Sequence, residues 1–168
     1  MGRFRVYARS QFGLDLEATQ AATIREAWFQ AFPGVRQWHR DTGDVMDRAG
    51  QGGITTRTIA GRARRNVDRY TEALNTPVQG SGADITKLAL AYIYADRDNA
   101  PVPAACAYSV QGWYPVMVIH DEIVLEVPEG SGEAMSAWLS KHMVAAGNAV
   151  MRDVPCGVEA SWGKSWVS

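Results

Sequence analysis

Three adjacent polar residues, His120, Asp121 and Glu122, interrupt an otherwise apolar stretch between residues 116 and 127. Runs rich in Val, Ile and Leu favour strands, and an abrupt polar break between two such runs predicts a tight hairpin turn. Two carboxylates at one turn repel each other unless a cation lies between them. Because Mg²⁺ commonly uses one or two carboxylates together with substrate phosphates, we expect a metal site at the hairpin tip. The competing interpretation is a solvated turn.

The two strands that would hold this turn differ in pattern. The second, residues 123–127, alternates apolar and polar side chains, so one of its faces is expected to be buried. The first, which starts at Trp113, is apolar on both faces and is expected to lie centrally in a sheet. We expect Asp121 to adopt the unusual backbone angles that a tight turn needs.

A second group of candidate residues is basic. Five of the 14 arginines lie from Arg57 to Arg69, around a turn predicted at residues 61–65 that follows a β-prone segment at residues 54–60. Arg62, Arg64 and Arg65 are the phosphate-binding candidates, because a guanidinium group binds phosphate oxygens in a forked geometry. A merely solvated turn explains the cluster equally well.

The third group lies in residues 75–94, whose apolar spacing predicts a helix. Thr76, Pro77 and Gln79 fit a capping box with proline at the first helical position, which would give Gln79 a structural role. Residues 80–83 (GSGA) are small, and glycine costs a helix about 1 kcal/mol relative to alanine. Another chain, either protein or nucleic acid, lying against the backbone would explain them. Asn75 and Gln79 would then share the helix face that meets a DNA minor groove.

Composition sets limits on the other possibilities. The 168 residues are 46% hydrophobic and carry a net charge of −1, which is typical of one globular domain with a core. Residues 1–69 hold 12 Lys and Arg against 7 Asp and Glu, whereas residues 70–168 are acidic. Two cysteines without CxxC spacing argue against zinc and favour a reduced cytoplasmic setting. No signal peptide or membrane span is expected.

The remaining elements are predicted from periodicity. We expect residues 1–14 to be a basic loop end or a frayed terminus, Asp15 to cap a helix at 17–31, and a second helix to run from residue 35 to Gly50 as the other arm of a helical hairpin. Residues 96–112 are predicted to form a loop with a short strand at 105–108. A helix at 133–151 and a strand at 156–162 follow. The layout predicts an α+β fold with an antiparallel sheet covered by helices.

Residues 75–84 (NTPVQGSGAD), together with residues 118–122 (VIHDE), closely resemble the C-terminal part of family A DNA polymerases, the group of bacterial DNA polymerase I and phage replicative enzymes. Counterparts also exist for residues 32–35 (FPGV), for Gly61-Arg62, and for Glu159, Trp162 and Trp166. The resemblance covers essentially the whole chain. It implies that residues 1–73 are partial fingers, with the helical hairpin and the Arg-rich turn, and that residues 74–168 are a palm portion.

The resemblance also implies roles for the candidate residues. Template-directed nucleotidyl transfer in this family uses two metal ions, expected to be Mg²⁺. Asp121 resembles one of two metal-bridging aspartates, and Glu122 resembles its supporting carboxylate. His120 resembles the residue that contacts the primer terminus. Asn75 and Gln79 resemble the pair that touches template and primer through the minor groove. Backbone phosphates are expected to bind Arg62, Arg64 and Arg65.

The other catalytic aspartate of the family and the helix that binds the deoxynucleoside triphosphate have no counterpart in these residues. We therefore expect the chain alone to be inactive, and to work with the N-terminal remainder of a larger or split polymerase. The expected partners are primer-template DNA and a deoxynucleoside triphosphate, in the cytoplasm of a bacterial or phage-infected cell. One alternative is a non-catalytic DNA-binding or assembly module. Another is a small metal-dependent nuclease that recruits Asp84 or Glu159 beside Asp121 and Glu122.

Overall fold

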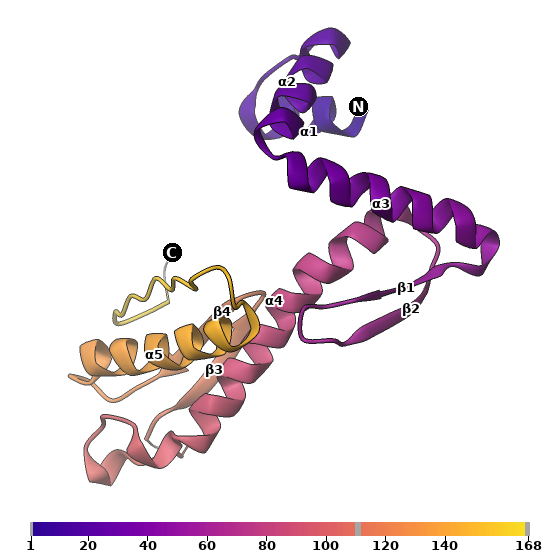
Figure 1. Cartoon of the computed structure of the whole chain (residues 1–168). Coiled ribbons are helices and arrows are strands. Elements are labelled where there is room, and N and C mark those ends of the chain that lie inside the picture. Colours follow the sequence, from indigo (N-terminus) through magenta and orange to yellow (C-terminus); the bar gives the residue numbers. More distant parts are fainter. Residues whose placement is uncertain (1, 110–111, 167–168) are drawn as a thin grey trace. The chain divides into compact units, whose positions relative to one another are not determined.

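A computed structural model describes residues 2–109 and 112–166. Residues 110–111, within the predicted loop at 96–112, lie outside the described residues, as do Met1 and residues 167–168. The chain forms two compact units, one ending at Ile54 and the other beginning at Thr55. Figure 1 labels the elements of both units. The predicted assignment of 1–73 to partial fingers and 74–168 to a palm portion stays a prediction.

The first unit is helical. Its helices are α1 (Gly2–Phe12), α2 (Ala18–Ala31) and α3 (Pro33–Ala49), followed by the 3₁₀ turn η1 (Gly50–Gly52). The expectation of a loop or frayed terminus at residues 1–14 is therefore wrong. Helix α1 ends in an αL motif, because Gly13 has a φ of +67° and its N–H bonds to the Arg9 carbonyl at 3.1 Å. Gly13 is thus the residue of the sequence that signals the end of this helix.

Helix α2 begins two residues later than expected for a cap at Asp15. Glu17 is the N-cap, and its backbone N–H bonds to the Gln20 side chain at 2.8 Å in a reciprocal capping box. Only Phe32 separates α2 from α3, and Gly50 ends α3 as predicted. The buried ring of Phe29 lies under the guanidinium groups of Arg25 and Arg36, 4.6 and 5.3 Å from its centroid.

The second unit mixes helices and strands. Strands β1 (Ile54–Arg57) and β2 (Ala63–Val67) form one two-stranded sheet, and β3 (Tyr114–Ile119) pairs antiparallel with β4 (Glu122–Glu126) in another. The helices are α4 (Tyr70–Ala95) and α5 (Gly132–Val150), with short 3₁₀ turns η2 (Arg97–Asn99) and η3 (Ala104–Cys106). The α+β prediction is confirmed.

Two of the predicted strands are absent from the described residues. The segment 105–108 overlaps η3, and Tyr108 makes only an isolated bridge with Trp113. The segment 156–162, predicted as a strand from its alternation, has no regular structure. Its alternating side chains contact helix α5 instead, since Cys156 and Trp162 lie against Gly147 and Gly132.

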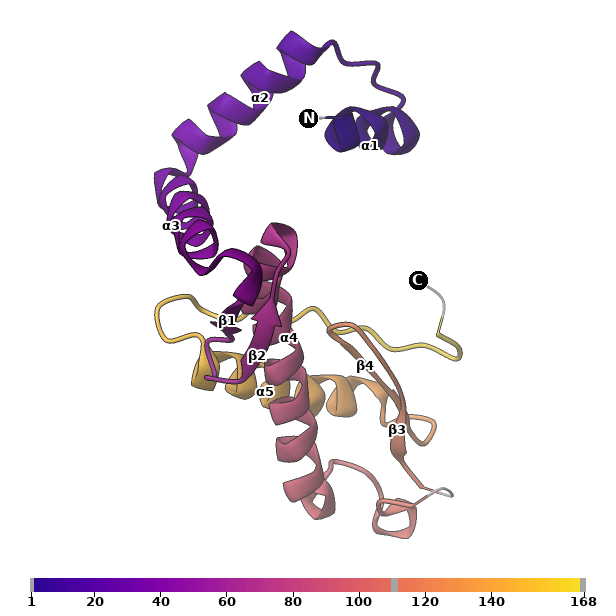
Figure 2. The ribbon, with the colours of Figure 1, turned by 90° about the vertical axis from the view of Figure 1, so that its right-hand side faces the viewer.

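The core of this unit lies between α4, α5 and the β3–β4 hairpin. Ile93, Trp113 and Met135 are almost fully buried, and the Trp113 and Trp138 rings meet edge to face at 5.1 Å. Figure 2 shows α4 and α5 crossing beside the hairpin. These contacts fix the hairpin on the two helices through its inward face.

Helix α4 begins at Tyr70, five residues before the predicted start, so the capping box at Thr76 and Gln79 is wrong. The Thr76 hydroxyl instead donates to the Glu72 carbonyl at 2.8 Å, one turn back in the same helix. Pro77 lies inside the helix and cannot donate a hydrogen bond to the Ala73 carbonyl. The Thr56 hydroxyl from β1 donates to that carbonyl, with an oxygen–oxygen distance of 3.4 Å.

Candidate nucleic-acid and metal site

The acidic hairpin ends in a two-residue turn. Ile119 pairs with Glu122 in the β3–β4 ladder, so His120 and Asp121 alone form the connection. The φ angle of His120 is +54°, and Asp121 is not in the left-handed region. The expectation that Asp121 would take the unusual backbone angle is thus wrong, although histidine is one of the residues that adopt it more readily than most. His120, Asp121 and Glu122 are all exposed.

The two carboxylates differ in their contacts. Glu122 Oε1 accepts a hydrogen bond from the indole Nε1 of Trp166 at 2.8 Å. Asp121 makes no hydrogen bond or ion pair with residues 2–109 and 112–166. No group of three or more His, Cys, Asp or Glu that could hold a metal ion occurs within these ranges. The hairpin therefore offers two adjacent carboxylates, which fits the small number that Mg²⁺ usually takes from a protein.

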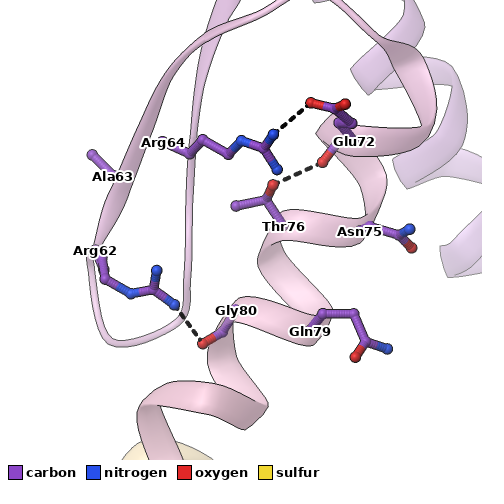
Figure 3. A pocket seen from close by; sticks show the side chains of 8 residues that line it. All are labelled: Arg62, Ala63, Arg64, Glu72, Asn75, Thr76, Gln79 and Gly80. Carbon is purple, nitrogen blue, oxygen red and sulfur yellow. Dashed lines mark hydrogen bonds and ion pairs between the residues drawn. The ribbon is translucent and has the colours of Figure 1, made fainter. Parts of the chain in front are cut away.

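The amide side chains of Asn75 and Gln79 are exposed, and Figure 3 shows both projecting from one side of α4. Neither side chain makes a hydrogen bond within the described part of the chain. Their spacing of four residues explains the shared side, as predicted. Two amides without an intramolecular partner remain available to a ligand.

The three candidate arginines are exposed, yet two of them bind acidic residues of α4. Arg62 Nε lies 2.7 Å from Asp84 Oδ1, and its Nη2 donates to the Gly80 carbonyl at 3.0 Å. Arg64 Nη2 lies 2.6 Å from Glu72 Oε2. Arg65 makes no ion pair or side-chain hydrogen bond with the described residues. Arg65 is therefore the member of the cluster whose charge is uncompensated in this structure.

Arg62, Arg64, Asn75 and Gln79 line one open pocket of about 460 Å³ between the β1–β2 hairpin and α4. Figure 3 shows the arginines reaching α4 from the hairpin. Burial raises the pKa of Asp84, but contacts with Thr58 and Arg62 outweigh burial, so the pKa lies below its ordinary value. An ionised Asp84 keeps Arg62 paired at neutral pH.

The small residues of α4 have an explanation within the chain. A Cβ atom at Gly80 would lie 2.7 Å from Thr58 Cγ2, so the glycine admits the β1–β2 turn. Ser81 is buried and accepts a hydrogen bond from the Ile59 N–H at 2.9 Å. The expected approach of another chain is thus wrong for Gly80, whose neighbour is the chain's own hairpin. Gly82 has nothing within 4 Å of a Cβ position and stays open to a ligand.

The turn of the acidic hairpin lies beside α4 in both ribbon views (Figures 1 and 2). Among the described residues, β3 pairs only with β4. It is therefore an edge strand here, and not the central strand of a sheet that its sequence predicts. Val116, Met117 and Val118 are 47, 36 and 44% exposed. Such apolar exposure on a strand with only one paired edge marks a surface that another strand or chain can cover.

Several contacts that build this site could not be predicted from the sequence. Ser81 and Asp84 attach the arginine hairpin to α4, Thr58 accepts a hydrogen bond from the Arg62 N–H within that hairpin, and Trp166 contacts the acidic hairpin. The contacts of Ser81, Asp84 and Trp166 span 22, 22 and 44 positions. No local pattern reports such pairs. Among the described residues, no helix is apolar and long enough to cross a membrane.

Comparisons with known proteins relate the whole site to one group. The family model "DNA polymerase family A" matches residues 5–168. DNA polymerase I of Aquifex aeolicus is 29% identical over 160 residues, covering 95% of this chain and 26% of that protein. DNA polymerase I of Mycobacterium tuberculosis H37Rv is 33% identical over 175 residues, covering 95% of this chain and 18% of that protein.

A solved structure agrees with these relatives. The polymerase domain of Pol1 from M. smegmatis, in complex with a DNA primer-template and dNTP, matches with a TM-score of 0.70 and 29% identity. The match covers 94% of this chain and 27% of that chain. The chain spans about a quarter or less of the relatives that it matches. Because the family model covers nearly every residue, this chain belongs to DNA polymerase family A.

Proposed function

We propose that this chain is part of a DNA-directed DNA polymerase and contributes to template-directed nucleotidyl transfer in DNA replication. The observation that carries the proposal is the family match over residues 5–168, which includes both the α4 segment and the acidic hairpin. The solved polymerase that this chain resembles is bound to primer-template DNA and dNTP, which supports the same partners here. Its relatives are bacterial, and we place the reaction in the cytoplasm of a bacterial or phage-infected cell.

In this proposal the acidic turn is the catalytic part of the chain. Asp121 and Glu122 hold the metal, and His120 contacts the primer terminus from the adjacent position. Two exposed and adjacent carboxylates at the end of a paired hairpin support the assignment. When bound, Mg²⁺ ions stabilise the negative charge on the attacking and leaving oxygens.

We propose that DNA lies along α4. Asn75 and Gln79 reach base edges and sugars in the minor groove, which present hydrogen-bond acceptors to amide donors. The absence of intramolecular partners for both amides, within the described residues, supports this role. Arg65 contacts backbone phosphate, and Arg62 and Arg64 do so while they hold the β1–β2 hairpin against α4.

The remaining catalytic parts come from the N-terminal remainder of the polymerase in this proposal. The two carboxylates of the hairpin do not by themselves supply a site for two ions, and no third acidic residue joins them in the described ranges. The exposed apolar residues of β3 support an additional strand from the remainder. Accordingly, we propose that the chain alone extends no primer.

The test uses a hybrid polymerase, in which this chain replaces the matching 160-residue region of the Aquifex aeolicus enzyme. The hybrid should extend a primed template with Mg²⁺, and the isolated chain should not. DNA binding that is indifferent to Asp121→Asn, without any extension, would instead identify a binding module. Cleavage of single- or double-stranded DNA by the isolated chain would identify a nuclease. Either result contradicts the proposal.

A further inference from the structure

The C-terminal segment, residues 151–166, crosses from α5 to the acidic hairpin without regular structure. It is attached to α5 at two places before it reaches the hairpin. The Cys156 N–H donates to Asn148 Oδ1 at 3.0 Å, and Cys156 lies against Gly147. The Trp162 ring lies against Gly132, where an added Cβ would come within 2.8 Å. Two glycines of α5 therefore make room for the segment, which argues for a defined path.

The segment ends at the hairpin with a single directional contact. Trp166 Nε1 donates to Glu122 Oε1 at 2.8 Å, although both side chains are exposed and lie 44 residues apart. Glu122 is the first residue of β4 and directly follows Asp121. Its other oxygen, Oε2, has no hydrogen bond or ion pair in the part of the chain that the structure describes. The contact therefore restricts the rotamer of Glu122 and leaves one oxygen open.

The group that donates to Glu122, the indole N–H of Trp166, carries no charge. An arginine or lysine at this place would compete with a metal ion, because it would neutralise the carboxylate. An indole N–H is neutral and can only donate, so it orients the carboxylate and leaves its negative charge intact. A group that must remain anionic and oriented beside a cation is best supported by such a neutral donor.

We propose that Trp166 is a positioning residue for Glu122, so that the C-terminal segment preorganises the acidic turn for metal-assisted nucleotidyl transfer. This inference rests on the proposed function, which gives Glu122 its role at the reaction site. Trp166 acts through Glu122 and does not itself touch the substrates.

The first experiment tests the contact in the isolated chain. Indole N–H resonances are recorded by ¹⁵N NMR and assigned with Trp166→Phe and Trp162→Phe. Glu122→Ala should move the Trp166 resonance toward that of a solvated indole and leave the Trp162 resonance in place. An unchanged Trp166 resonance would overturn the proposal whether or not any polymerase activity is found.

The second experiment measures single-nucleotide incorporation by the hybrid polymerase. Trp166→Phe keeps the ring and removes the donor, and a single hydrogen bond predicts a kcat about 3- to 10-fold lower with KM for the nucleotide nearly unchanged. Trp162→Phe is the matched control and should keep kcat. In a Glu122→Ala background, Trp166→Phe should cause no further loss.

The outcomes separate the two proposals. Full activity of Trp166→Phe alongside an inactive Glu122→Ala hybrid would overturn the positioning role and leave the proposed function standing. Full activity of the Glu122→Ala hybrid would contradict the proposed role of Glu122 itself. A hybrid without activity counts against the proposed function, and the NMR result then decides whether Trp166 orients Glu122.

Discussion

Arg62 and Asp84 form an ion pair with 2.7 Å between Nε and Oδ1, and this pair joins the β1–β2 hairpin to helix α4. The same guanidinium donates to the Gly80 carbonyl, so one arginine contacts the helix at two successive turns. An arginine in a basic turn is thus a structural clamp as well as a phosphate-binding candidate. Arg65, which has no such partner among the described residues, should therefore affect DNA binding without affecting stability.

Arg65→Ala should weaken DNA binding without loss of stability, because Arg65 has no partner in the described residues. Loss of one phosphate contact should reduce the slope of log affinity against log salt by about 1. Fluorescence anisotropy with labelled primer-template at several salt concentrations measures the slope. Arg152→Ala, an exposed arginine outside the proposed DNA surface, is the control. Equal slopes for Arg65→Ala and the unmodified chain would exclude the phosphate contact.

Gly80→Ala should destabilise the second unit, because the new methyl group would lie 2.7 Å from Thr58 Cγ2. We expect a loss of about 1–3 kcal/mol in the free energy of unfolding, typical of overpacking. Gly82→Ala adds the same group in open space and should be neutral or stabilising by up to about 1 kcal/mol. Urea unfolding measures both variants. Equal changes for the two would show that the β1–β2 turn does not pack against Gly80.

Thr56→Val should cost stability because it removes the donor to the Ala73 carbonyl that Pro77 leaves unpaired. The expected loss is about 0.5–1.5 kcal/mol. In a Pro77→Ala background the helix can supply its own N–H to that carbonyl, so the loss should shrink. A double-mutant cycle by urea unfolding tests this coupling. Strict additivity would mean that the Thr56 hydroxyl does not serve the Ala73 carbonyl.

Asp96 should make stability depend on acid pH. Its pKa is lowered by a hydrogen bond from Asn99, and further by Trp138 and His142, against the opposing effect of burial. A lowered folded pKa means that the stabilisation is present above the ordinary carboxyl value of about 3.9 and is lost as pH falls through the folded value. Asp96→Asn should therefore be less stable at pH 5 and have a flatter profile down to pH 2.5. Parallel profiles in chemical unfolding would refute the linkage.

The sequence sufficed for features that depend on local pattern. Periodicity located α2, α3, α5 and most of α4, and the polar break in an apolar stretch located the β3–β4 turn. The shared side of Asn75 and Gln79 followed from helical spacing alone. Side chains on one face recur every 3.6 residues in a helix and every 2 residues in a strand. The spacing of apolar residues along the sequence therefore shows which face of an element is buried.

Other features could be recognised only in the folded structure, because they depend on contacts between residues far apart in the sequence. Pro77 suggested a helix start, and only the contact with Thr56 shows how the helix can begin earlier, at Tyr70. The alternation at residues 156–162 suggested a strand. In the structure this segment pairs with no strand, and its side chains pack against two glycines of α5 instead. The pairing of Arg62 with Asp84 joins residues 22 positions apart, and such tertiary contacts leave no periodic signal.

The proposed catalytic role of the acidic turn depends most on Asp121, and single-nucleotide incorporation by the hybrid polymerase carrying Asp121→Asn tests that role directly. The substitution keeps the size of the side chain and removes its charge, so the incorporation rate should fall at least about a hundredfold, with affinity for primer-template nearly unchanged. Asp98→Asn changes a highly exposed carboxylate elsewhere and should keep the full rate. An Asp121→Asn hybrid that incorporates nucleotide at the rate of the unsubstituted hybrid would contradict the proposed catalytic role of the acidic turn.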